Sequence, residues 1–373
     1  FGMGNLLHGY KWVSSLFFLN STFYLPYIEY YSLHFTTLFF LIFFNYFLLK
    51  EISSKTNHEF FKYIYLFTLI FFNLSFNRLA EYGTDKTGQL LIVILIIKIF
   101  QFTCFEKNKV DFSKLLMVIP LLAFCMTLKT YFLPYILLGL ILISFNKNFL
   151  NTLKIIFLSK SFLIFIISLS IYLLHHFIST GCIISPISFT CFGDNLNWAH
   201  SKLHYESLSG AMERWAKAGM GPNFQVENPI QYVQSFNWVP RWFEFYFMGK
   251  VKDQLLILLL TFLISFILFK KFKFRTKVLT FNKKILFFYV IIFIIFSIWF
   301  THHPQLRYGG YAICFLVISI PIALTFSKFE NKLFFEKKLS YLLIFIIIVF
   351  NLKNITRINS EFKRTDLYKF NEF

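Results

Sequence analysis

The segment FNRLAEYGTDKT, residues 76–87, places four charged side chains directly before a long apolar run: Arg78, Glu81, Asp85 and Lys86. A carboxylate held at a membrane boundary can act as a general base, or bind a metal ion or a substrate hydroxyl. The alternative is a solvated turn in which Asp85 or Thr87 caps the helix that the apolar run predicts. The spacing alone leaves both interpretations open.

A second cluster, THHPQLRYGG at 301–310, combines two adjacent histidines, an arginine and a tyrosine. The planar guanidinium of Arg307, next to Tyr308, suits the oxygens of a phosphate or pyrophosphate. His302 or His303 could donate a proton or a hydrogen bond to the same group. Adjacent histidines do not readily ligate one metal ion, so no zinc site is predicted. The alternative is a polar turn whose arginine reaches lipid headgroups.

Lys129 forms a third candidate, between two short apolar runs at 115–128 and 131–145. A cation at the tip of such a helix pair suits a lipid-linked phosphate, although a single lysine at a helix end also serves as a topological marker. His175 and His176 lie near the end of another apolar run, 161–178. The sequence contains no glycine-rich phosphate loop, Ser-His-Asp order or HExxH pattern.

The elements that must position these residues are membrane helices. Of the 373 residues, 57% are hydrophobic and only 15% are charged, whereas a soluble domain carries about a quarter charged residues. Apolar runs that approach the thickness of a bilayer core follow one another along the chain. We therefore expect an all-α integral membrane protein with about ten or eleven transmembrane helices. The runs are 31–49, 60–76, 88–105, 115–128, 131–145, 161–178, 253–269, 285–300, 309–327 and 340–352.

The net charge of +19 indicates the membrane topology of the chain rather than a surface that binds nucleic acid. Most Lys and Arg lie in every second linker, and the positive-inside rule puts those linkers in the cytoplasm. The segments 77–87, 179–252 and 301–308 then face outward. The predicted organisation is a transmembrane part at 1–178, an extracytoplasmic amphipathic loop at 179–252, C-terminal transmembrane helices at 253–352 and a polar tail at 353–373.

The long outer loop carries four tryptophans at 198, 215, 238 and 242. Tryptophan at this density is typical of a segment that lies in the membrane interface, and aromatic rings that stack on sugars are the alternative. Cys182 and Cys191 share this loop and could form a disulfide if it faces an oxidising compartment.

Short motifs distributed over most of the chain resemble the GT-C superfamily of polytopic membrane glycosyltransferases, in particular a group of uncharacterised bacterial members. They are GMGNLLHGYKWVSSLFFLN, AEYGTD, TGCIISP and HHPQLRYGG. The resemblance implies a transferase that uses a polyprenyl-phosphate-linked sugar on the outer face of the bacterial inner membrane. A divalent cation and the oligomeric state are left open, and no nucleic-acid partner is expected.

The resemblance also implies roles for the candidate residues. Glu81 and Asp85 match a second outer loop with an assisting acidic residue, whereas the principal carboxylate is expected upstream of Phe1. Lys129, His303 and Arg307 match positions that hold the donor phosphate, and Arg78, His302 and Tyr308 are further candidates.

Other functions remain open for such a chain. A polysaccharide polymerase also handles polyprenyl-linked glycans and also carries outer-loop arginines. A transporter or flippase of lipid-linked glycans should show charges at mid-bilayer and internal repeats, which the sequence does not display. A non-catalytic membrane partner would use its charges for topology alone.

Overall fold

The computed structural model describes residues 34–54, 58–76, 85–104, 116–128, 130–144, 149–220, 225–269, 283–328 and 335–364. These residues are almost entirely helical, and among them there is no β-strand, only an isolated bridge between Cys182 and Cys191. The predicted all-α membrane fold is therefore confirmed. Within the described ranges, five segments are long and apolar enough to cross a membrane: Asp85–Thr103, Lys160–Thr180, Val239–Leu268, Lys283–His302 and Lys338–Ser360.

The chain divides into two compact units. The first comprises 1–37, 83–252 and 280–318, and the second comprises 38–82, 253–279 and 319–373. All the described candidate residues from the charged clusters lie in the first unit. Its helices are α5 (Asp85–Cys104), α7 (Val118–Leu128), η3 (Thr130–Leu137), α8 (Leu138–Ser144), α9 (Phe149–Phe157), α10 (Lys160–Thr180), α11 (Lys202–Ala216), α12 (Pro229–Val233), α13 (Val239–Trp242), η6 (Phe243–Val251), α15 (Lys283–His302), η7 (Leu306–Tyr308) and the start of α16 (Gly310–Phe326).

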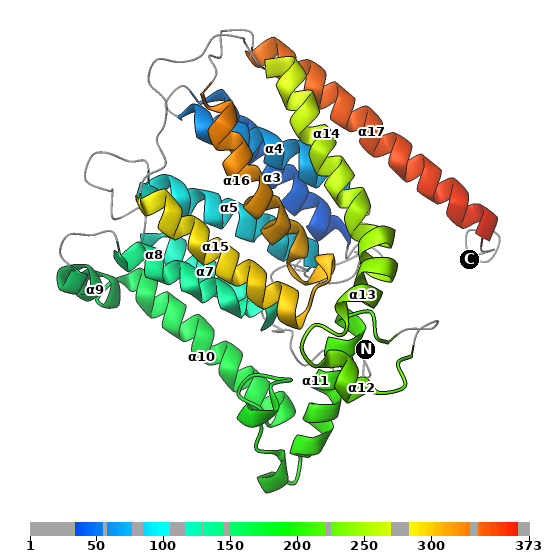
Figure 1. Cartoon of the computed structure of the whole chain (residues 1–373). Helices are drawn as coiled ribbons and strands as arrows, with labels where there is room; N and C mark the ends of the chain where they lie inside the picture. The colour runs from blue at the N-terminus through cyan, green and yellow to red at the C-terminus, as the bar shows by residue number, and fades with distance from the viewer. Residues whose placement is uncertain are drawn as a thin grey trace, which may run out of the picture. The chain divides into compact units, whose positions relative to one another are not determined.

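Helices α5 and α15 form an antiparallel pair in this unit (Figure 1). Phe100 of α5 stacks on Phe288 of α15 with ring centroids 4.2 Å apart. At one end of the pair, Lys284 Nζ donates to the carbonyl of Thr103 at 3.4 Å. At the other end, Gln89 binds the chain that follows α15. The start of α5 and the end of α15 therefore lie together, as do the end of α7 and the start of η3 through their packing on these helices.

The ends of α10 are set by local residues. Ser159 accepts a hydrogen bond from the amide of Phe162 at 3.1 Å, which caps the first turn. Gly181 adopts a left-handed φ of 73°, a conformation that a side chain disfavours, and ends the helix. The chain then leaves the bundle as the segment 181–238, which precedes α13.

Two of the four tryptophans expected in the membrane interface are exposed, and the other two are buried. Trp198 and Trp215 are 55% and 44% exposed, as interface anchors should be. Trp238 and Trp242 are 0% and 5% exposed, so they are packing residues of the first unit instead. Their burial brings the start of the Val239–Leu268 span against the loop after α15, as described below.

The second unit is built around α4 (Glu59–Ser75), whose side chains are buried on nearly every face. Phe67 packs edge-on against Phe262 and Phe326 at 5.0 and 5.4 Å. Asn45 and Asn73 exchange two amide hydrogen bonds of 2.9 and 2.7 Å, which satisfies both polar groups among apolar helices. The surrounding helices are α3 (His34–Ser53), α14 (Lys252–Phe269), the end of α16, and α17 (Phe335–Arg364), which continues into the expected polar tail.

Candidate functional site

The loop that joins α15 to α16, residues 303–309, is held in place by two buried indoles. Trp242 Nε1 donates to the carbonyl of Pro304 at 2.8 Å, and Trp299 Nε1 donates to the carbonyl of Gln305 at 3.0 Å. The first bond satisfies the carbonyl of Pro304, and the second adds to the 3.0 Å bond that the carbonyl of Gln305 accepts from the amide of Tyr308. They also tie the loop to α13 and to the last turns of α15.

Two further contacts hold the middle of this loop. The amide of Leu306 donates to the hydroxyl oxygen of Tyr246 at 2.8 Å. Gln89, which is 1% exposed, donates through Nε2 to the carbonyls of Leu306 and Arg307 at 3.2 and 3.3 Å. Its Oε1 accepts from the amide of Ala312 at 3.1 Å. The backbone on both sides of Arg307 is thus positioned by one side chain of α5.

The fixed backbone presents the side chain of Arg307 beside Asp85, the first residue of α5. Arg307 Nε and Asp85 Oδ2 are 3.9 Å apart, and the two side chains are 50% and 22% exposed. The guanidinium carbon also lies 5.0 Å from the ring centre of Tyr308. An ion pair at this distance and exposure contributes at most about 1 kcal/mol to stability. Its main effect is to orient the half-exposed guanidinium of Arg307.

An aromatic group adjoins the arginine. Tyr131 of η3 stacks on Tyr308 with centroids 4.4 Å apart, and it meets His303 edge-on at 4.8 Å. Burial lowers the pKa of His303 to about 3, and the neighbouring His302 and the positive charge of Lys217 contribute to this shift. His303 is therefore neutral at pH 7, where its imidazole can donate one hydrogen bond and accept another.

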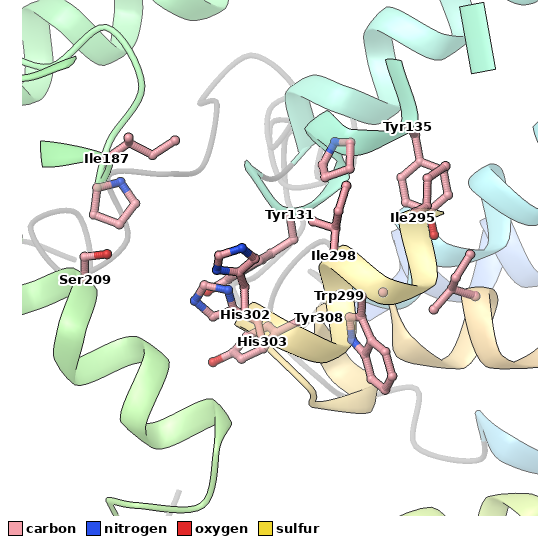
Figure 2. Close-up of a pocket in the computed structure, with 14 residues that line it drawn as sticks. Tyr131, Tyr135, Ile187, Ser209, Ile295, Ile298, Trp299, His302, His303 and Tyr308 are labelled. Atoms are coloured by element: carbon pink, nitrogen blue, oxygen red, sulfur yellow. The ribbon is translucent and has the colours of Figure 1, made fainter. Parts of the chain in front are cut away.

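These residues border a cavity of about 360 Å³. Figure 2 shows Tyr131, Ile298 and Trp299 on one side, Ile187 and Ser209 on the other, and the imidazoles of His302 and His303 between them. Apart from these histidines, the lining is mainly aromatic and aliphatic. Its residues are Tyr131, Pro134, Tyr135, Pro186, Ile187, Ser209, Ile295, Ile298, Trp299, His302, His303, Tyr308, Gly309 and Ile313. An apolar cavity next to a cation suits a ligand with an apolar body and an anionic group.

Two glycines allow the close packing at the rim of this cavity. Gly309 has a φ of 95°, in the left-handed region, so the chain can turn from η7 into α16. A Cβ on Gly310 would lie 2.5 Å from Cζ2 of Trp299 and 3.1 Å from the carbonyl oxygen of Gln305. Gly309 is thus required by the turn of the backbone, and Gly310 by the packing of the loop against Trp299.

The structure brings together part of the predicted set. Asp85, His302, His303, Arg307 and Tyr308 gather at one end of the first unit. The predicted Arg78, Glu81 and Lys129 lie outside the described residues. Whether each gathered residue has its predicted role stays a prediction.

His176 lies near the end of α10, as the apolar run indicated, and it is fully buried. Its Nδ1 accepts a hydrogen bond from the amide of Ser185 at 3.2 Å. It therefore supports the loop after α10. Within the described ranges, no three His, Cys, Asp or Glu side chains lie close enough to hold a metal ion.

The sequence interpretation missed the residues that position the arginine. Gln89 lies inside an apolar run, where a buried amide requires hydrogen-bond partners, and that requirement was the available signal. Trp242 was expected in the membrane interface because tryptophan is common there, and Tyr246 was not singled out. Lys217, which the sequence did not single out, is buried, forms a 2.6 Å ion pair with Glu213, and lies 5.3 Å from the ring centre of Trp238.

The model of a protein family described as "Domain of unknown function (DUF8201)" matches residues 1–314, which include the whole candidate site. No curated protein and no solved structure matches the chain.

Proposed function

Since the chain belongs to the DUF8201 family, whose function is unknown, we propose its activity from the site itself: a membrane glycosyltransferase of the GT-C type. It would move a sugar from a polyprenyl-phosphate-linked donor to a glycan, lipid or protein acceptor. The observation that carries this proposal is the half-exposed Arg307, fixed through its backbone beside Asp85 and next to an apolar cavity.

The chemistry needs a base on one side of the sugar and cations on the other. The acceptor hydroxyl gives its proton to a carboxylate while its oxygen bonds to the anomeric carbon. The bond from that carbon to the phosphate oxygen breaks, and its electron pair leaves with the polyprenyl phosphate. Cations stabilise the negative charge of this leaving group. Arg307 is suited to that task because its fork of donors matches phosphate oxygens.

The carboxylate is assigned by position. Asp85 lies 3.9 Å from Arg307, at the phosphate end, so in this proposal it orients the guanidinium, and the acceptor proton goes to a carboxylate on the other side of the sugar. Glu81 is the further acidic residue of this sequence that the resemblance implies. Lys129 would add a second cation, and its near neighbour in the chain, Tyr131, does contact Tyr308 at the cavity.

The apolar cavity gives the donor lipid a place beside the bundle. Its lining is mainly aliphatic and aromatic, so the isoprenoid chain next to the phosphate would lose water contact there. His303 is neutral at pH 7 and therefore does not repel a cation or add charge to the cavity. It can instead donate a hydrogen bond to a phosphate oxygen.

The outer face of the bacterial inner membrane is the proposed location of this site. Lys284, at the far end of α15 from Arg307, follows the basic linker that the positive-inside rule assigns to the cytoplasm. The loop beside the cavity contains a disulfide between Cys182 and Cys191. Disulfides persist in oxidising compartments, which supports an extracytoplasmic position.

Binding to a polyprenyl monophosphate tests the anionic part of the proposal. We expect purified wild-type protein in lipid nanodiscs to bind the phosphate and to bind the matching polyprenol, which lacks it, much more weakly. Arg307→Ala should weaken binding of the phosphate about tenfold or more, since hydrogen bonds to charged groups contribute about 1.5–3 kcal/mol. The matched control is Arg214→Ala on α11, an arginine that does not line the cavity.

Sugar transfer needs a second experiment. A donor with a labelled sugar should yield labelled acceptor in membranes with wild-type protein and much less with Arg307→Ala or Glu81→Ala. Movement of the intact labelled lipid across the bilayer, with no transfer, would instead identify a flippase. Normal cell-surface glycans in cells that carry either folded variant would remove both residues from the mechanism.

A further inference from the structure

The cavity has a wall that does not come from the membrane helices. Pro186, Ile187 and Ser209 all line it, and all three belong to the segment between α10 and α13. In Figure 2, Ile187 and Ser209 face the imidazoles of His302 and His303 from the side opposite α15. The aromatic content of this segment had suggested an interfacial anchor or a sugar platform, not a wall of an apolar cavity.

The loop that carries Pro186 and Ile187 is closed at its base. Cys182 and Cys191 form a disulfide, and the amide of Ile183 donates to the carbonyl of Thr190 at 3.0 Å beside it. The 3.2 Å bond from the amide of Ser185 to His176 ties the same loop to α10. The disulfide therefore closes a ten-residue ring that contains both lining residues.

Helix α11, which carries Ser209, is docked at both of its ends. Near its start, the hydroxyl of Tyr205 donates to the carbonyl of Thr180 at 2.6 Å. Near its end, Gln305 Nε2 donates to the carbonyl of Trp215 at 2.8 Å. Gln305 belongs to the same loop as Arg307, so α11 and the arginine loop share one hydrogen-bonded support.

We propose that the segment 181–216 is part of the ligand site: its disulfide-closed loop and α11 form the outer wall of the cavity, and Ser209 sets the width available to the apolar chain. The Cys182–Cys191 bond holds Ile187 in this wall. This inference rests on the proposed function, because it assigns to that donor a contact with the outer segment.

Filling the cavity from the wall tests the inference. Ser209→Phe places a ring into the space opposite His302, so we expect polyprenyl monophosphate to bind at least about tenfold more weakly in nanodiscs, which corresponds to about 1.4 kcal/mol. Ser207→Phe is the matched control: it lies on the same helix, is exposed and does not line the cavity. Its affinity should match that of the wild type.

A footprint keeps the inference falsifiable if the large substitution disturbs folding. In Ser209→Cys, the lipid phosphate should slow alkylation of residue 209, measured by peptide mass spectrometry, whereas alkylation in Ser207→Cys should not change. Equal protection at both positions, or none at 209 while the wild type binds, overturns the inference and leaves the proposed function in place. A wild-type protein that does not bind the lipid phosphate overturns both.

A separate variant tests the role of the disulfide. The double variant Cys182→Ser/Cys191→Ser should bind the lipid phosphate about threefold to tenfold more weakly, because the backbone bonds of the loop remain while the cross-link that restricts Ile187 is lost. Unchanged affinity in the double variant would show that the cross-link does not hold the wall.

Discussion

Gln89→Leu is the substitution that most directly tests how Arg307 is positioned. The leucine has a similar size but removes two donated bonds, of 3.2 and 3.3 Å, and one accepted bond of 3.1 Å. Each contributes about 0.5–1.5 kcal/mol, and the partners are buried backbone groups that lose a bond. We therefore expect a loss of about 2–4 kcal/mol in the free energy of unfolding.

Thermal unfolding of the purified protein measures this loss. A change of this size lowers Tm by about 4–16 °C in a domain of 150–250 residues. Gln101→Leu is the control, since Gln101 lies on the same helix and accepts one 3.3 Å bond from Lys98. Gln89→Glu separates shape from hydrogen bonding: the carboxylate keeps the shape but places negative charge against the carbonyls of Leu306 and Arg307.

The positioning of Arg307 by Gln89 should also affect ligand binding. If Gln89 acts through the backbone of Arg307, then Gln89→Leu should weaken binding of polyprenyl monophosphate, and adding Arg307→Ala should cause little further loss. A Tm within about 1 °C of the wild type, together with additive losses of affinity in the double variant, would refute this account, since independent residues add.

Three other substitutions have defined outcomes. The pKa of His303 is lower in the folded state than in the unfolded chain, so the unfolded chain takes up a proton at higher pH. The contribution of His303 to stability is therefore complete above about pH 6.5 and is lost as the pH decreases toward 3. His303→Gln should flatten the dependence of Tm on pH over this range, and an unchanged slope would contradict this prediction. Gly310→Ala should lower Tm by several degrees, because its Cβ would lie 2.5 Å from the indole of Trp299; a neutral result would mean that the loop shifts freely. Asn73→Leu should reduce the resistance of the second unit to denaturation by about 1 kcal/mol, because Asn45 loses its partner among apolar helices; hydrogen exchange in α4 measures this loss.

The helices were predictable because the bilayer imposes a single pattern on them. The run 161–178 became α10, Lys160–Thr180, and the run 285–300 became α15, Lys283–His302, each with bounds close to those expected. Length and apolar composition are sufficient where every backbone group must be bonded within its own helix. The two short runs around Lys129 likewise appear as α7 and as η3 with α8.

The contacts that shape the site were not predictable in the same way. Gln89 meets partners 217 and 223 positions away in the chain, and no local pattern reports such a distance. Ser209 belongs to no motif in the sequence, and only the folded chain places it at the cavity. Tryptophan is common in membrane interfaces, so the sequence predicted an interfacial position for Trp242. In the structure its indole is instead buried and donates a hydrogen bond to the carbonyl of Pro304.

The hydrogen bonds at both ends of the antiparallel pair of α5 and α15 restrict how these two helices can move in a bilayer. Because the pair is joined at one end through Gln89 and at the other through Lys284, neither helix can slide along the other without breaking a bond at both ends. A membrane helix whose length does not match the bilayer thickness can tilt or kink. We expect this pair to tilt as one body, so that Arg307 keeps its place over the start of α5 in membranes of different thickness.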